Sequence, residues 1–311
     1  MVKVMKKKKV LIISIVTVAA AALVILGFLI FGKLNKRTLR VSDVSGDASI
    51  TRNDIEKIEL YKNMNILSGD SLVLNNGVLT LKADRDKYIY FDEKSELEIN
   101  ISGTKRKSET DISLKRGAVS FDIRKKLSKT SVFMVNTPNA SVSAKGDIFR
   151  VETYEENNLQ YTRVMVFKGG VDVRLIDKEG NESEEEQFVV EGNEVIICED
   201  ENNTQYVAAP AEIDYARLPA TVLKRLAKIS SRKLCIKKEE IEKYLEGKAE
   251  VTFKYNDKVY CIESVEKDTV ILSTPTDPSV GGEWDYDFTK PVKEDIEIEW
   301  KQNSSDTEAE N

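Results

Sequence analysis

The chain has 311 residues, of which 41% are hydrophobic, and this is enough for about two ordinary domains. It contains no histidine, which excludes Ser-His-Asp catalysis, Cys-His catalysis and zinc sites with histidine ligands. Residues 1–40 carry nine Lys or Arg and no acid, whereas residues 41–311 carry 38 cations against 53 anions, a net charge of −15. Because so acidic a body repels phosphate backbones, nucleic acid is not an expected partner.

The first element expected is a membrane helix. Residues 10–32 are 23 consecutive uncharged residues, rich in Ile, Leu, Val and Ala. As a helix with a rise of ~1.5 Å per residue they would span about 35 Å, enough to cross a bilayer with a little tilt. The main rival is a cleaved signal peptide, whose apolar region of about 7–15 residues would end at a small-residue cleavage site. The four alanines at residues 19–22 lie in mid-segment instead, so we predict an uncleaved signal anchor.

The charges that flank this segment leave its orientation open. Five Lys precede it, and four Lys or Arg follow it within ten residues. A short Lys-rich leader usually stays in the cytoplasm, and long downstream domains cross largely regardless of charge. We therefore expect residues 1–9 to be a cytoplasmic basic tail and residues 33–311 to be the extracytoplasmic body of a single-pass protein in the cell membrane.

Residues 39–207 are expected to form an all-β domain. Hydrophobic residues recur there with period two, as in Leu79 and Leu81, in short runs separated by turn residues. The triplet NNG at 75–77 is one of the predicted turns. Many short, evenly spaced strands predict a barrel, a sandwich or a solenoid.

The stretch TPNASVSAKGDIFRVE at 137–152 has a distinctive construction. Pro138 enters a strand, Gly146 permits a bulge or a positive φ, and Phe149 resumes the alternation. Together with ISLKRGAVSFDI before it and TRVMVFKGGVDVRL after it, this stretch resembles the FecR domain. The resemblance implies that Pro138, Gly146, Phe149 and Gly169 are structural signature residues. It also implies an extracytoplasmic β module, found in membrane regulators that pass a surface signal to sigma factors and in proteins that decorate cell envelopes.

Residues 211–247 change to helical spacing and are expected to form a helical connector packed on a neighbouring domain. Pro219 suits a first helical turn, and Gly247 suits a helix stop. The apolar residues that recur every three or four positions are Leu218, Val222, Leu226 and Ile229.

Residues 250–301 return to strand spacing, and the polar residues 302–311 are expected to be a disordered tail. The segments VTFKYNDKVYCIESVEKD and PTDPSVGGEWDYDFTKPVKEDIEIEWK resemble one copy of the Listeria–Bacteroides repeat, a small β-grasp-like module of bacterial surface proteins, with a shortened central section. The resemblance implies that Trp284 and Trp300 are signature residues. Its other matching positions are Val251, Phe253, Gly282, Phe288 and Pro291.

Motifs for catalysis, cofactors or metals do not emerge from the sequence. Ser-x-x-Lys occurs at 102–105 and 230–233, but SDN and KTG follow neither, so chance is the simpler interpretation. No Walker A or Rossmann glycine pattern is present, and the acidic runs lack EF-hand spacing. The chain has three cysteines, Cys198, Cys235 and Cys261. We expect free thiols, and a single disulfide between two of them is the alternative. We therefore predict no enzymatic activity, no cofactor and no metal.

Two further features bear on the function that the FecR resemblance implies. Where the family typically has Arg-Gly-Thr, this chain has Lys145, Gly146 and Asp147. The nine residues before the predicted membrane segment are too few for the cytoplasmic anti-sigma domain of the regulator class. The sequence thus favours a mainly β, non-enzymatic surface protein whose modules bind or scaffold an unknown protein or envelope polymer. The alternative is a transmembrane signalling regulator that passes an extracytoplasmic signal to a separate cytoplasmic or membrane partner.

Overall fold

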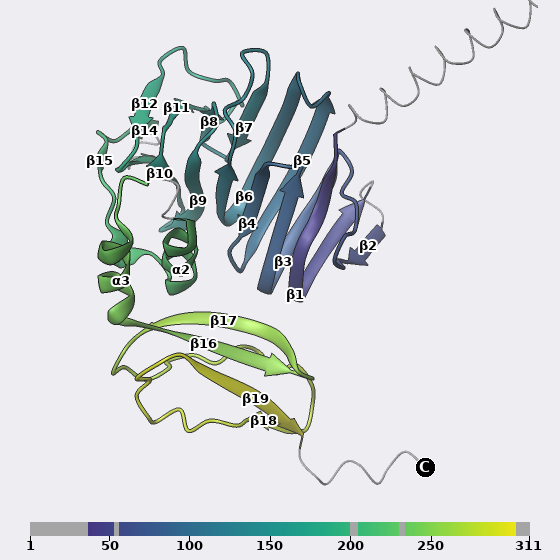
Figure 1. Ribbon diagram of the computed structural model, residues 1–311, viewed down its shortest axis with the longest axis vertical. Coiled ribbons are helices and arrows are strands. Elements are labelled where there is room, and N and C mark those ends of the chain that lie inside the picture. The colour runs from purple at the N-terminus through teal and green to yellow at the C-terminus, as the bar shows by residue number, and fades with distance from the viewer. Residues whose placement is uncertain (1–36, 53–55, 200–204, 230–233, 303–311) are drawn as a thin grey trace, which may run out of the picture.

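The computed structural model describes residues 37–52, 56–199, 205–229 and 234–302. The predicted basic tail 1–9, the predicted membrane segment 10–32 and all but the first residue of the predicted tail 302–311 lie outside these residues. In the part of the chain that is described, no helix has the length and apolar character needed to cross a membrane. The described residues form a large β domain, two short α-helices and a small second sheet, in that order along the chain (Figure 1).

The β domain contains 15 strands joined in one hydrogen-bonded network within the described residues. They fall in the zone predicted to be all-β, with one further short strand beyond it. The strands are β1 (Leu39–Arg52), β2 (Glu56–Glu59), β3 (Asp70–Ala83), β4 (Lys87–Phe91), β5 (Ser95–Gly103), β6 (Ser108–Ile123), β7 (Val132–Asn136), β8 (Ala140–Ala144), β9 (Ile148–Glu156), β10 (Leu159–Lys168), β11 (Gly170–Leu175), β12 (Gln187–Val190), β13 (Asn193–Glu199), β14 (Gln205–Val207) and β15 (Ala211–Glu212).

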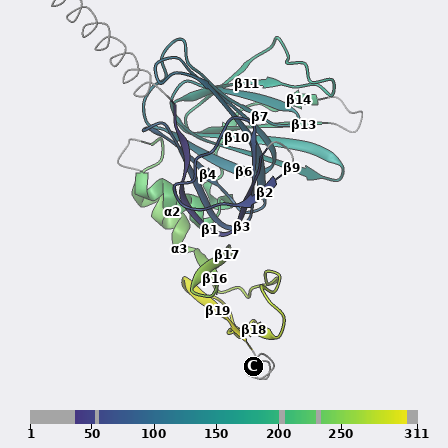
Figure 2. The ribbon, with the colours of Figure 1, turned by 90° about the vertical axis from the view of Figure 1, so that its right-hand side faces the viewer.

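This network folds over on itself because its long strands change partners halfway along. The first half of β3 pairs with β5 and the second half with β4. In the same way, β6 first pairs with β5 and β7, and then with β4 and β9. The result is a sandwich (Figure 2) with a first layer β2-β1-β3-β5-β6-β7-β8-β11-β12 and a second layer β1-β3-β4-β6-β9-β10-β13. The strands β1, β3 and β6 belong to both layers.

Glycines form the bends at which these strands pass from one layer to the other. Gly46, Gly77 and Gly117 have φ angles of 81°, 94° and 86°, in the left-handed region that other residues rarely adopt. Gly46 lies opposite Gly77 in the register of β1 and β3. A Cβ on Gly77 would lie 2.3 Å from the carbonyl oxygen of Ser45. The turn predicted at 75–77 is therefore wrong: NNG lies inside one continuous strand, because glycine lets β3 bend without ending.

The space between the layers is filled by side chains that alternate along the strands. In the centre, Phe121 stacks on Phe149 with ring centroids 4.7 Å apart, and both belong to the second layer. Phe133 of the first layer meets both rings edge-on. All three are fully buried, and each contributes roughly 1.5–3 kcal/mol through burial. The alternation resumed at Phe149 is thus the core face of β9.

The outer face of the second layer is covered by α2 (Ala220–Ile229) and α3 (Lys238–Glu246), which follow the short 3₁₀ helix η1 (Tyr215–Arg217) (Figure 1). Leu223 and Leu226 of α2 form one cluster with Met165 and Phe167 of β10. The predicted helical connector therefore packs on the β domain. Pro219 directly precedes α2. Gly247 follows α3 as expected, but its φ of −83° is right-handed.

The C-terminal module contains a four-stranded sheet in the order β17-β16-β19-β18, in which β16 and β19 run parallel. Its strands are β16 (Lys248–Tyr255), β17 (Lys258–Glu266), β18 (Gly282–Trp284) and β19 (Ile296–Gln302). Trp284 and Trp300 meet edge to face in its core, with ring centroids 5.1 Å apart. A Cβ on Gly282 would lie 2.5 Å from Nε1 of Trp300. Gln302 belongs to a strand rather than to the predicted tail.

Replacing a bend glycine should destabilise the β domain more than replacing a loop glycine of similar φ. For Gly77→Ala we expect a loss of roughly 3 kcal/mol in the free energy of unfolding, because a left-handed φ costs about 1–2 kcal/mol and the new Cβ would clash with the backbone of β1. Gly180→Ala is the control, since Gly180 has a φ of 86° and a Cβ added there would have nothing within 4 Å, and its loss should be about 1 kcal/mol. Urea unfolding measures both, and equal losses would contradict the proposed role of the bend.

Candidate functional site

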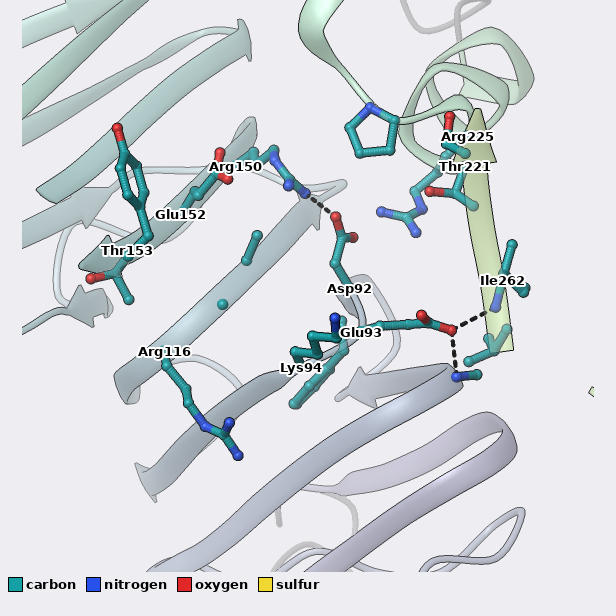
Figure 3. A pocket seen from close by; sticks show the side chains of 18 residues that line it. Asp92, Glu93, Lys94, Arg116, Arg150, Glu152, Thr153, Thr221, Arg225 and Ile262 are labelled. Atoms are coloured by element: carbon teal, nitrogen blue, oxygen red, sulfur yellow. Dashed lines mark hydrogen bonds and ion pairs between the residues drawn. The ribbon is translucent and has the colours of Figure 1, made fainter. Parts of the chain in front are cut away.

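A cavity of about 610 Å³ lies where the β domain, α2 and the C-terminal module meet (Figure 3). The bend glycines Gly77 and Gly117 form part of its wall. Pro219 at the start of α2 and Ile262 of β17 close the other sides. All three parts of the described chain therefore contribute to one cavity.

Inside the cavity, Arg150 of β9 forms an ion pair with Asp92, which follows β4. Nη1 of Arg150 lies 2.7 Å from Oδ2 of Asp92, and the Arg150 side chain is only 3% exposed. Its Nε is buried without a hydrogen-bond partner among the described residues. Arg150 points outward from the second layer, between the core residues Phe149 and Val151, and is buried because α2 and the C-terminal module cover that face.

A second guanidinium enters the cavity from α2. Cζ of Arg225 lies 4.4 Å from the centroid of the Tyr90 ring. Burial lowers the pKa of Arg225, with Asp92 opposing this effect and Arg150 adding to it. Figure 3 shows the Arg225 guanidinium directed toward the Arg150–Asp92 pair. Within the described residues Arg225 makes no hydrogen bond and no ion pair, and its Nη1 is inaccessible to solvent.

Arg37 shows how this fold pairs a buried arginine completely. Its guanidinium donates to the carboxylate of Asp84, to the hydroxyl of Thr110 at 2.9 Å and to the carbonyl oxygens of Ser102 and Glu109. The residue is 8% exposed. Buried cations normally find such partners. Arg225 is half-buried against the Tyr90 ring and has no hydrogen-bond or ion-pair partner in the described residues, so it is an exception.

Glu93 connects the bend of the β domain to the C-terminal module. Its Oε1 accepts hydrogen bonds from the backbone N–H groups of Gly77 and Ile262, both at 2.7 Å (Figure 3). The thiol of Cys261 donates to its Oε2 at 3.3 Å. Burial raises the pKa of Glu93, and these hydrogen bonds partly oppose the rise. Burial and the nearby Glu93 charge also raise the pKa of Glu263.

A second set of polar contacts joins α2 to the C-terminal module. Nζ of Lys224 lies 2.6 Å from Asp295 and 3.2 Å from Glu250. The N–H of Ala220 donates to the hydroxyl of Ser264 at 2.8 Å. The C-terminal module is therefore connected to the rest of the cavity wall in two places. Glu93 connects it to the bend, and the first two turns of α2 connect it to the helix.

Two of the predicted signature residues, Gly146 and Gly169, lie on the opposite edge of the sandwich from the bend. There the chain crosses between layers from β8 to β9 and from β10 to β11. Their φ angles are 123° and 86°. Asp147 lies against Gly169, where a Cβ would be 1.8 Å from Oδ1 of Asp147, and burial raises the pKa of Asp147 to about 6. Both positions therefore require glycine for backbone reasons, whatever further function the family gives them.

The remaining predicted signature residues are also away from the cavity. Pro138 is exposed in the turn between β7 and β8, two residues before β8 begins. Phe149 is a core residue of the β domain, and Trp284 and Trp300 are core residues of the C-terminal module. The structure does not bring these residues together into one site.

No group of three or more Cys, Asp or Glu side chains in the described ranges is placed to hold a metal ion. The hydroxyl of Ser102 donates to Glu109 at 2.6 Å, and the second Ser-x-x-Lys match at 230–233 lies outside the described residues. The cysteines are free thiols, with Cys198 and Cys261 buried and Cys235 exposed.

Sequence reasoning did not find the residues of this cavity. Alternation around Arg150 places it on the outward face of β9, where a charged residue normally meets solvent. Arg225 lies within an amphipathic helix, and a cation there is equally ordinary. Asp92 and Glu93 lie in a polar turn, where acidic residues are common and indicate no site. Their proximity arises only when α2 and β17 pack against the bend, and no local sequence pattern records that packing.

One family model matches a segment of the β domain. The family model described as FecR protein matches residues 75–172, which confirms the FecR resemblance for this segment. The match includes the bend of β3 and most of the residues that line the cavity, among them Asp92, Glu93 and Arg150. The resemblance of residues 250–301 to the Listeria–Bacteroides repeat is not confirmed and stays a prediction.

Two crystal structures of a protein from Parabacteroides distasonis ATCC 8503, described as a "putative anti-sigma factor", are similar to this chain. The structure at 1.65 Å resolution has 14% sequence identity and a TM-score of 0.37, and it covers 75% of this chain and 99% of that chain. The structure at 2.50 Å resolution has the same identity and coverage, with a TM-score of 0.36. No curated protein matches the chain.

Neutralising Glu93 should change how the stability of the protein depends on pH. A carboxyl whose pKa is raised by folding favours the folded state below its ordinary pKa of 4.5 and loses that contribution as pH rises through the folded value. Glu93→Gln keeps an oxygen acceptor for Gly77 and Ile262 but carries no charge. We therefore expect the stability of the variant, relative to wild type, to increase as pH rises above about 4.5.

Urea unfolding of both proteins between pH 4.5 and pH 8 measures this difference. Glu155→Gln, at an exposed position on β9, is the control and should give a flat difference. A flat or falling difference for Glu93→Gln would show that the Glu93 carboxylate is not held at a disadvantage in the folded protein.

Proposed function

We propose that this chain is a signalling regulator: its β domain receives an extracytoplasmic signal, and the chain passes that signal to a separate membrane or cytoplasmic partner. The FecR match over residues 75–172 supports this alternative better than the scaffold interpretation, which gains no support. The resemblance implies that FecR domains are the outer parts of membrane regulators. The extracytoplasmic location and the membrane segment 10–32 are parts of the proposal.

The observation that carries the proposal is the anchoring of Arg37 in the β domain. Arg37 and Asp84 form an ion pair of 3.3 Å whose side chains are 4% and 6% exposed, and Lys87 also lies 3.3 Å from Asp84. Removing one partner of such a buried pair typically costs about 3–5 kcal/mol. Residues 33–36 separate Arg37 from the predicted membrane segment, and four residues reach at most about 14 Å. A movement of the β domain would therefore act on the membrane segment through a short connection.

The second half of β3 leads from the cavity to this anchor. It begins at Gly77, whose N–H is bound by Glu93, and ends at Ala83, next to Asp84. At about 3.3 Å per residue, the strand covers roughly 20 Å between the two places. We infer that a change in the contacts of Glu93 or α2 at the cavity would reach Arg37 along this strand.

A flexible insertion between the predicted membrane segment and Arg37 tests the proposed function. Ten Gly and Ser residues inserted after Gly32 would keep the protein tethered but would remove the short connection. We expect the insertion strain to show the same changes in gene expression as a deletion strain, measured by RNA sequencing. The same insertion after Ser305 is the control and should leave expression as in wild type.

The scaffold interpretation predicts the opposite result for this insertion. A tethered scaffold would tolerate the insertion after Gly32. An insertion strain that matches wild type, alongside a deletion strain that differs from it, would therefore contradict the regulator proposal.

A further inference from the structure

We propose that the cavity at the bend binds a small molecule bearing an oxyanion, with its carboxylate or phosphate group held between Arg225 and Arg150. The inference rests on the proposed function for its biological meaning, since it names the class of signal that the β domain would receive. Its physical basis is the buried Arg150 and the half-buried Arg225 that enter the cavity.

The charges that line the cavity are distributed unevenly. Four cations and three anions line it, and one of the cations, the exposed Arg116, is paired with Glu96 outside the lining. The lining cations are Lys94, Arg116, Arg150 and Arg225, and the lining anions are Asp92, Glu93 and Glu152. Two of the cations, Arg150 and Arg225, enter the same part of the cavity beside Asp92, and this is where an anion would be attracted.

The anions present do not neutralise Arg225. Asp92 is within ion-pair distance of Arg150 and not of Arg225. Both oxygens of Glu93 accept hydrogen bonds from other groups. Glu152 lines the cavity, and within the described chain it forms no ion pair with either arginine. Arg225 lies over the face of the Tyr90 ring but has no anionic partner among the described residues. A desolvated cation without an anion is costly, and a bound oxyanion would reduce that cost.

The donors left free suit an oxyanion. Nη2 of Arg150 and Nε and Nη2 of Arg225 make no hydrogen bond among the described residues, and they are not closed off from solvent as Nε of Arg150 and Nη1 of Arg225 are. A guanidinium offers its N–H groups as a fork that matches two oxygens of a carboxylate or a phosphate. Thr221 lines the cavity in the first turn of α2, where the helix dipole also favours a negative group. Arg225 as a whole remains partly exposed, so a ligand in the cavity can reach it.

The rest of the wall indicates a ligand with an apolar part. Val78, Phe91, Pro219 and Ile262 line the cavity next to the charged groups. A small organic carboxylate or phosphate would satisfy both kinds of wall. A ligand held by Arg150 of β9 and by Arg225 of α2 would also bridge the two elements whose relative position the proposed signal would change.

Titration of the purified full chain in detergent tests this inference. Sodium phosphate and sodium succinate are the probes, sodium chloride keeps the ionic strength constant, and isothermal titration calorimetry measures binding. We expect saturable binding of at least one probe with a stoichiometry of one. Binding of phosphate alone would assign a phosphate ligand, binding of succinate alone a carboxylate ligand, and binding of both the shared oxyanion chemistry.

Variants connect the binding to the two arginines. Arg225→Gln should weaken binding at least tenfold. Arg174 of β11 forms an exposed ion pair with Glu186. Arg174→Gln therefore removes an equal charge elsewhere and should leave binding unchanged. Arg225→Lys keeps the charge but lacks the fork, so it should also weaken binding and serves if Arg225→Gln does not fold. No saturable binding of either probe, or equal affinity in the Arg225 and Arg174 variants, would overturn the inference.

The outcomes separate this inference from the proposed function. Binding that depends on Arg225, together with a silent insertion after Gly32, would leave the anion site standing and remove the regulator role. Absence of binding, together with an insertion that mimics the deletion, would remove only the anion site.

Discussion

The architecture depends on three strands that belong to two sheet layers at once. β1, β3 and β6 can do so because Gly46, Gly77 and Gly117 adopt backbone conformations that side chains oppose. Gly77 and Gly117 line the cavity on the outer side of the bend, and α2 and β17 contribute its other walls. The cavity is therefore a consequence of how the sandwich is folded. The wall formed by Gly77 and Gly117 belongs to the bend itself. The other walls come from α2 and β17, which lie further along the chain.

Buried charges define the two ends of the proposed signalling route. Arg37 is fully paired, which fixes the start of β1 against β3 and β6. Arg225 lies over the Tyr90 ring but has no hydrogen-bond or ion-pair partner among the described residues, and it lies beside the buried Arg150. A fully paired buried charge sets a position, whereas an unpaired one favours any state that supplies a partner. This difference explains why the first suits an anchor and the second suits a binding site.

The sequence allowed the zones of the chain to be predicted, because hydrophobic period is a local property. The β zone, the helical connector and the C-terminal strands all occur where they were expected. The sequence predicts a turn at Gly77, where the structure has a bend within β3. NNG is compatible with a turn and with a bend, and only the pairing of β3 with β5 before it and with β4 after it shows that the strand continues. Arg150 and Arg225 gave no signal, because the burial of a charged residue depends on elements distant in sequence. The FecR resemblance pointed to glycines on the far edge of the sandwich, which are structural requirements of the crossings between layers.

The most direct test of the account is whether the cavity and the Arg37 anchor are coupled through β3. Hydrogen–deuterium exchange of the full chain, compared between wild type and Glu93→Ala, measures this coupling amide by amide. The variant removes the acceptor of the Gly77 and Ile262 amides, so faster exchange at those two positions is expected in any case. The account predicts faster exchange also at Thr38 and Asp84, at the far end of β3. Exchange that changes only around Gly77 and β17, with Thr38 and Asp84 unaffected, would contradict it.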